Sequence, residues 1–224
     1  MLVFAMACGG PAVSPAPHRY LALGDSFTIG TGVGEERSFP AQLVRLWHER
    51  GIDVALANPA VNGYTTGALI EAELPLARTG RPTIVTLAIG ANDIVRRSDE
   101  ITYRWELRRI FAELVDATVS PFSIYALPQP DWSLSPAARG FGEPAALRAT
   151  IDRFNLVMRS EAERAAARYI DLGPLMRRQA EAGMLAADRL HPSAEALAEW
   201  ALQLAAEIDI SGPRWTASDT SIRT

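Results

Sequence analysis

Apolar runs of strand-like composition alternate with helix-like segments along the chain, and this alternation restricts the fold more than any other feature of the sequence. Strands that are separated by helices pair in parallel, because each helix carries the chain back to the same end of the sheet, and the helices then cover both faces. The expected strands are residues 20–23, 52–57, 83–89, 122–127 and 169–172. The sequence therefore predicts an α/β protein with a five-stranded parallel sheet.

Apolar residues at helical spacing predict the helices that connect these strands. The expected helices are 39–50, 67–78, 99–118, a segment marked by Leu147, Ile151, Phe154 and Met158, and 194–208. In the helix over 99–118, the predicted apolar face consists of Ile101, Trp105, Ile110, Phe111, Leu114 and Val115. Residues 211–224 follow the last helix and are expected to be a disordered tail.

Composition excludes several classes of function. The net charge is −4, and the sequence has no run of basic residues of the kind that binds a phosphate backbone, so nucleic acid is not an expected partner. All 22 basic residues are arginine, which excludes Schiff-base chemistry and a lysine-dependent phosphate loop. The histidines His18, His48 and His191 are far apart in a chain with one cysteine, so the sequence predicts no metal site.

The N-terminal segment ends its short apolar run in small residues followed by Cys8, and it resembles the end of a bacterial lipoprotein signal. The apolar run is shorter than the usual core of ~7–15 residues and lacks a basic start, as a truncated signal would. We expect residues 1–17 to be such a signal and tether, with lipidated Cys8 holding the protein at the bacterial cell envelope. The alternative is a hydrophobic tail with an incidental cysteine on a cytoplasmic protein.

Ser26 is the first candidate for chemistry. It lies just beyond the expected strand over 20–23, within Gly24-Asp25-Ser26-Phe27, and ligands bind at this end of the strands in open parallel sheets. Ser26 is therefore a candidate nucleophile. The alternative is that Asp25 and Ser26 only cap the next helix.

Asp188 and His191 supply what a serine nucleophile needs. A serine hydroxyl attacks well only when an imidazole takes its proton, and that imidazole needs a carboxylate to orient it. Asp188 and His191 are three residues apart before the last helix, so they can meet locally. Gly63 and Asn92 follow the second and third strands at the same sheet edge, where they are candidate oxyanion donors, or else residues of ordinary turns.

The proline- and glycine-rich segment 128–142 is an unusually long loop that leaves the sheet at the same edge. Long loops in compact domains are often functional, so we expect it to form a wall or lid of the substrate pocket, with Trp132 as a pocket residue. A surface loop with Trp132 packed on a neighbouring helix fits equally well. The aromatic residues Trp132 and Phe141 are expected to be exposed.

Taken together, these motifs resemble the SGNH hydrolases, also called the GDSL esterase and lipase family. The matching blocks, in the family's order, are Gly24-Asp25-Ser26-Phe27, Asn62-Gly63, Gly90-Ala91-Asn92-Asp93 and Asp188-Arg189-Leu190-His191. Phe27 replaces the leucine of the family's name.

The resemblance implies a hydrolase domain over 18–210 with a flavodoxin-like three-layer α/β/α fold and strand order 2-1-3-4-5. It implies that Ser26 is the nucleophile, His191 the general base and Asp188 the residue that orients it. The implied oxyanion hole comprises the Ser26 N–H, the Gly63 N–H and the Asn92 side chain. No cofactor is implied, and the expected partner is a small-molecule ester or thioester.

Other classes share parts of this pattern. An α/β-hydrolase places its nucleophile in Gly-x-Ser-x-Gly, whereas Thr28 stands two residues after Ser26. A dinucleotide-binding motif needs Gly-x-Gly-x-x-Gly, whereas residues 30–34 read Gly-x-Gly-x-Gly, with one residue too few before the third glycine. Within the family, a carbohydrate O-acetyl esterase and a non-catalytic binding protein are the remaining alternatives.

Overall fold

A five-stranded parallel sheet forms the centre of the protein in a computed structural model that describes residues 18–118 and 120–210. The strands are β1 (His18–Gly24), β2 (Val54–Ala57), β3 (Ile84–Ala88), β4 (Ile124–Ala126) and β5 (Arg168–Tyr169). Their order is β2-β1-β3-β4-β5, and every neighbouring pair is parallel. This confirms the predicted sheet and its strand order.

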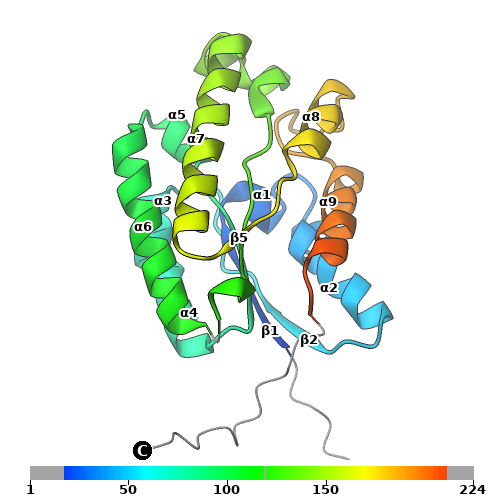
Figure 1. Cartoon of the computed structure of the whole chain (residues 1–224). Coiled ribbons are helices and arrows are strands. Elements are labelled where there is room, and N and C mark those ends of the chain that lie inside the picture. The colour runs from blue at the N-terminus through cyan, green and yellow to red at the C-terminus, as the bar shows by residue number, and fades with distance from the viewer. Residues whose placement is uncertain (1–17, 119, 211–224) are drawn as a thin grey trace, which may run out of the picture.

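Helices cover both faces of the sheet, as Figure 1 shows. The helices are α1 (Ser26–Ile29), α2 (Phe39–Glu49), α3 (Thr66–Ala72), α4 (Leu74–Gly80), α5 (Ala91–Val95), α6 (Glu100–Ala117), α7 (Pro144–Arg164), α8 (Gly173–Glu181) and α9 (Ala194–Glu207). Helices α3, α4, α6 and α7 lie on one face, and α2, α8 and α9 lie on the other. The predicted three-layer α/β/α architecture is therefore confirmed.

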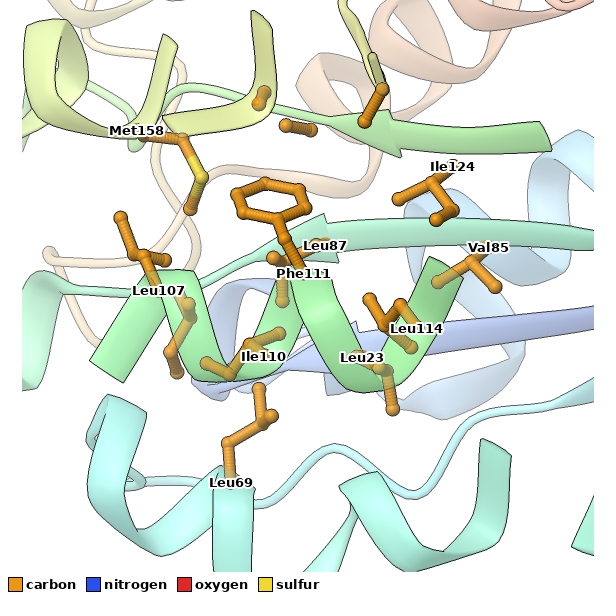
Figure 2. Close-up of a cluster of buried hydrophobic side chains, with 14 of the residues drawn as sticks. Leu23, Leu69, Val85, Leu87, Leu107, Ile110, Phe111, Leu114, Ile124 and Met158 are labelled. Atoms are coloured by element: carbon orange, nitrogen blue, oxygen red, sulfur yellow. The ribbon is translucent and has the colours of Figure 1, made fainter. Parts of the chain in front are cut away.

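Alternating side chains of the strands divide the core between the two faces. Along β1, Leu21 and Leu23 join the cluster under α6, whereas Tyr20 and Ala22 join the cluster under α2 and α9. This is the two-residue period of a strand that is buried on both sides. Figure 2 shows the first cluster, in which α6 points apolar side chains at the strands, with Leu69 and Met158 closing it from neighbouring helices.

Several elements differ from the sequence prediction. The helix expected over 67–78 is divided at Glu73 into α3 and α4, and Pro75 opens α4, where a missing backbone N–H costs little. The strand expected over 169–172 is shorter and begins earlier, at Arg168, and α8 follows it directly. The sequence analysis missed α8, which Pro174 begins.

The predicted apolar face of α6 is wrong in its first two turns. Ile101 and Trp105 are 69% and 61% exposed, whereas Tyr103 and Leu107 are completely buried. The buried residues continue at helical spacing through Ile110, Phe111 and Leu114, which were assigned correctly. The exposed Trp105 ring instead lies beside the guanidinium of Arg108, 4.8 Å from the ring centroid.

The loop over 128–142 contains two short 3-10 segments, Trp132–Leu134 and Pro136–Phe141. Trp132 is 4% exposed, so the expectation that it would be exposed is wrong, whereas Phe141 is 50% exposed as predicted. The two rings meet edge to face with centroids 5.9 Å apart. Trp132 is buried because it packs in one cluster with Leu147 and Ile151 of α7, which places this loop over the sheet edge.

The predicted signal, tether and lipidated Cys8 (residues 1–17) and the predicted tail (211–224) lie outside the described residues. Within residues 18–118 and 120–210, no helix has both the length and the apolar composition needed to cross a bilayer.

Candidate active site

Ser26 is the first residue of α1, at the point where β1 ends. The Asp25 carboxylate caps this helix by accepting a hydrogen bond from the Phe27 N–H at 3.0 Å. Gly24 is required before it, because a Cβ atom there would lie 2.2 Å from Thr28 Oγ1 and 2.4 Å from the Ala88 carbonyl oxygen. The turn that presents Ser26 is therefore wedged against the end of β3.

Asp188 and His191 form a hydrogen-bonded pair in the loop before α9. His191 Nδ1 lies 2.7 Å from Asp188 Oδ2, while Asp188 Oδ1 accepts from the N–H groups of Leu190 and His191 at 2.9 and 3.0 Å. Partial burial acts to raise the pKa of Asp188, but these donors outweigh it and the pKa is lowered. An ionised Asp188 holds the proton on Nδ1, which leaves Nε2 of the neutral ring free to accept a proton.

Ser26 and His191 line one cavity of about 120 Å³ at the carboxyl edge of the sheet. Its lining residues are Ser26, Phe27, Asn62, Ala91, Asn92, Val95, Trp132, Phe141, Leu190 and His191. The structure thus brings Ser26, His191, Asn92 and Trp132 together, with Asp188 behind His191. Gly63 is adjacent to the lining residue Asn62 and has a positive φ of 86°.

A second, larger cavity of about 470 Å³ lies between α7, β5 and α8. Its walls include Arg159, Tyr169 and Arg177 but none of Ser26, Asp188 or His191. The size of the reaction site is therefore given by the smaller cavity.

Asn92 lies in the first turn of α5 and donates both hydrogens of its amide to protein acceptors. Asn92 Nδ2 lies 3.0 Å from the Tyr64 carbonyl oxygen and 3.4 Å from Asp25 Oδ2. The second distance exceeds the usual N–H···O range of 2.7–3.2 Å, so that contact is weak. The hydrogen directed at Asp25 is the one that Asn92 can release to another acceptor.

Three carboxyl groups in or near the turn that carries Ser26 are almost completely buried: Asp25, Glu73 and Asp93. Burial raises the pKa of Asp25 to about 7, against the hydrogen bond from Phe27. Burial likewise raises the pKa of Glu73 to about 8, and the neighbouring Asp25 adds to it. Burial raises the pKa of Asp93 as well, although the Thr66 N–H and hydroxyl donate to it.

Sequence reasoning named Asp25 as a possible helix cap and as a member of a motif block, it included Asp93 only as a member of a block, and it missed Glu73. Glu73 was expected in the middle of one amphipathic helix, where a glutamate normally faces solvent. Pro75, two residues later, was the available signal, because a proline ends or begins a helix near its own position.

The raised pKa values predict that stability falls as the pH rises. Asp25 and Glu73 have ordinary values of 3.8 and 4.5, so the unfolded chain loses these protons near pH 4, whereas the folded protein keeps them to about pH 7 and 8. We expect the melting temperature to be lower at about pH 8.5 than at about pH 5.5 by at least about 5 °C. Each unit of pKa shift corresponds to about 1.4 kcal/mol of stability. A loss of 1 kcal/mol lowers the melting temperature of a protein of this size by about 2–4 °C.

Thermal unfolding followed by circular dichroism at the two pH values measures this difference. The control is Glu73→Gln, which removes one of the two titrations and should reduce the difference. Equal melting temperatures for the wild-type protein at both pH values would contradict the assigned shifts.

The fold and the grouping of Ser26, Asp188 and His191 at its carboxyl edge define an α/β/α protein of the SGNH type. The chain belongs to the GDSL-like lipase/acylhydrolase family, whose model matches residues 22–198. This confirms the resemblance that the motif blocks suggested.

Individual relatives agree with this assignment. The chain is 38% identical to an arylesterase from Vibrio mimicus over 85 residues, which are 38% of this chain and 42% of the relative, so the match spans less than half of that protein. The fold is similar to a lipase/acylhydrolase from Enterococcus faecalis, with 20% identity, a TM-score of 0.68, and coverage of 85% of this chain and 95% of that one. It is also similar to Axe2, an acetylxylan esterase from Geobacillus stearothermophilus, with 21% identity, a TM-score of 0.66, and coverage of 91% and 98%.

Proposed function

We propose that the protein hydrolyses carboxylic esters through an acyl-enzyme on Ser26, with His191 as the general base and Asp188 as its orienting carboxylate. One observation carries the proposal. Ser26 and His191 line the same cavity, and the His191 ring is fixed from behind by the 2.7 Å contact with Asp188. A hydroxyl, an imidazole and a carboxylate in this order are the parts of a serine hydrolase.

In the proposed reaction, Ser26 Oγ bonds to the ester carbonyl carbon while His191 Nε2 takes the serine proton. The tetrahedral intermediate then breaks its bond to the alcohol, which leaves with the proton from His191. Water attacks the acyl-enzyme, again giving its proton to His191, and the carboxylic acid is released as Ser26 regains its hydrogen. Each step uses side chains of this chain only.

Asn92 is the proposed side-chain donor of the oxyanion hole, with the N–H groups of Ser26 and Gly63. Its weak 3.4 Å contact with Asp25 is replaced by a bond to the oxyanion when the intermediate forms, while the 3.0 Å bond to Tyr64 keeps the amide in place. The amide is therefore already oriented before the reaction, which is what makes such donors effective.

We predict that Asn92→Ala lowers kcat by about 10²–10³, because a donor that acts mainly in the transition state is lost. The measurement is steady-state hydrolysis of a p-nitrophenyl ester, with folding checked by circular dichroism. Asn155→Ala is a matched control, because Asn155 bonds the backbone of Gln129 and does not line this cavity. Full kcat in a folded Asn92→Ala variant would remove Asn92 from the mechanism.

The cavity favours short or aromatic acyl groups. Apart from the polar residues already assigned, its walls are apolar or aromatic: Phe27, Ala91, Val95, Trp132, Phe141 and Leu190. A space of about 120 Å³ holds an acyl chain of a few carbons but not a long fatty acid. Trp132, whose ring is buried on the far side against α7, makes one of these walls rigid.

Acetyl esters of carbohydrates are the second candidate substrates, because an acetyl group fits this cavity and the sugar would remain outside it. A relative of the same fold is an acetylxylan esterase. This candidate differs from the first only in the alcohol part of the ester.

Hydrolysis of p-nitrophenyl esters from acetate to decanoate, beside release of acetate from acetylated xylo-oligosaccharides, tests the proposal. We expect kcat/KM to be highest for acyl chains of two to four carbons and to fall for longer ones. Activity confined to the acetylated sugar would favour the second candidate. No hydrolysis of any ester by the folded protein would contradict the proposed function.

A further inference from the structure

We propose that Glu73 is a positioning residue for the nucleophile, because its buried carboxyl group holds the Gly24 N–H and so fixes the turn that presents Ser26. The inference rests on the proposed role of Ser26. Glu73 lies between α3 and α4, outside all of the motif blocks of the family, and it touches neither the cavity nor the Asp188–His191 pair.

The Gly24 N–H needs an acceptor because β1 extends beyond β2. Pairing with β2 ends at Leu21 opposite Ala57, whereas pairing with β3 continues to Gly24 opposite Ala88. The His18 N–H points to the β2 side, where it donates to Asp53, and alternate residues of a strand point the same way. The Gly24 N–H therefore points to the side where the neighbouring strand has already ended.

Glu73 supplies the hydrogen-bond acceptor that a longer β2 would have supplied to the Gly24 N–H. Its Oε2 accepts the Gly24 N–H at 3.0 Å, and the residue is 1% exposed. Its other oxygen, Oε1, is buried and has no hydrogen-bond partner among the described residues. A buried carboxyl group with one unpaired oxygen is costly to the fold, and the contact that it makes with the Gly24 N–H is set against this cost.

The neutral acid fits this environment better than the carboxylate. Among the described residues, the charged group that acts on Glu73 is the carboxyl of Asp25, which has the same sign. Burial and this neighbour raise the pKa of Glu73 to about 8, so near neutral pH it bonds Gly24 through an uncharged oxygen. A glutamine has the same shape and offers the same kind of acceptor.

The contact between Glu73 and Gly24 is connected to the reaction site through Gly24 and Asp25. Gly24 is joined to Asp25, whose carboxylate caps Phe27 and contacts the Asn92 amide. Because Gly24 is wedged between Thr28 and the Ala88 carbonyl, a shift of its backbone moves the whole turn. Displacements of about 1 Å at a reacting group cost rates of the order of 10²-fold. Loss of the Glu73 acceptor should therefore act on kcat.

The test compares three replacements of Glu73. Glu73→Met fills the same volume without a strong acceptor, and Glu73→Asp keeps the acid but withdraws it by one methylene. Each is expected to lower kcat on p-nitrophenyl acetate by at least about 10-fold with little change in KM, while Glu73→Gln restores kcat to within about 3-fold of the wild type. Folding at the assay temperature is checked by circular dichroism.

Glu161→Ala is the matched control. Glu161 is also 1% exposed, but it lies on α7, where it pairs with Arg104 and Arg108 of α6 and with Arg164, and it does not line the cavity. Its loss should lower the melting temperature and leave kcat and KM unchanged. A similar loss of kcat in Glu161→Ala and in the Glu73 variants would show that the loss of any buried carboxyl group lowers activity, and would overturn the inference.

Two further outcomes would overturn it: wild-type kcat in folded Glu73→Met or Glu73→Asp, or a Glu73→Gln enzyme as impaired as they are. If Glu73→Met does not fold, the comparison of Glu73→Asp with Glu73→Gln decides. A burst of p-nitrophenol equal to one per molecule in the wild type, and absent from folded Ser26→Ala, shows that Ser26 is acylated. A folded wild type that shows no burst, and no acyl group on Ser26 by mass spectrometry, would reject the proposed function, whereas a normal burst with unaffected Glu73 variants would reject only this inference.

Discussion

Ser26→Ala is expected to lower hydrolysis of p-nitrophenyl acetate by at least about 10⁴-fold while leaving the protein folded. The loss is this large because the remaining polar side chains of the cavity, Asn62, Asn92 and His191, do not replace a serine hydroxyl as the group that is acylated. Removing one oxygen atom from a residue that is 5% exposed leaves the packing of α1 almost unchanged. The variant should therefore unfold at nearly the temperature of the wild type.

Ser38→Ala is the control for this substitution. Ser38 is completely buried but caps α2 through Ala41, away from the cavity, so its loss should cost stability and not kcat. A folded Ser26→Ala variant that keeps more than about one hundredth of wild-type kcat would exclude Ser26 as the nucleophile, given the size of the loss expected for a triad serine.

His191→Ala is expected to have the second largest effect, a loss of kcat of at least about 10³-fold, because among the described residues His191 is the base that lines the cavity and can accept the Ser26 proton. Asp188→Asn should be less severe than His191→Ala, since an amide can still contact Nδ1 but favours the wrong tautomer. The measurement is kcat on the same ester for both variants, beside circular dichroism spectra.

His48 provides a matched control for His191. Its Nε2 lies 3.1 Å from the Val54 carbonyl oxygen at the start of β2, far from the lining of the cavity. His48→Ala should keep wild-type kcat even if it lowers the melting temperature. Loss of activity in His48→Ala, together with full activity in His191→Ala, would reverse the assignment of the base.

The central strands β1, β3 and β4 could be predicted from local sequence because they are buried and read as apolar runs, as the alternating partners of Leu21 and Tyr20 illustrate for β1. The strand order followed from the family resemblance rather than from these runs. The contact between Asp188 and His191 was also predictable, since three residues in one turn separate them.

The features that sequence reasoning missed depend on contacts between distant parts of the chain. Ile101 and Trp105 are as apolar as Tyr103 and Leu107, and only the packing of α6 on the sheet decides which pair is buried. Trp132 is buried because residues of α7 pack against it. Glu73 becomes an acceptor for Gly24 only because β2 ends before β1 does, on the side to which the Gly24 N–H points, and no pattern around Glu73 reveals this.

The account depends most on a covalent bond to Ser26, and mass spectrometry of the protein after treatment with a p-nitrophenyl phosphonate measures that bond directly. Phosphonates react with the activated serine of such sites and leave a stable adduct that resembles the tetrahedral intermediate. We expect one adduct per molecule, on the peptide that contains Ser26, and none on folded Ser26→Ala. An adduct on another residue, or an unmodified protein that still hydrolyses esters, would contradict the account.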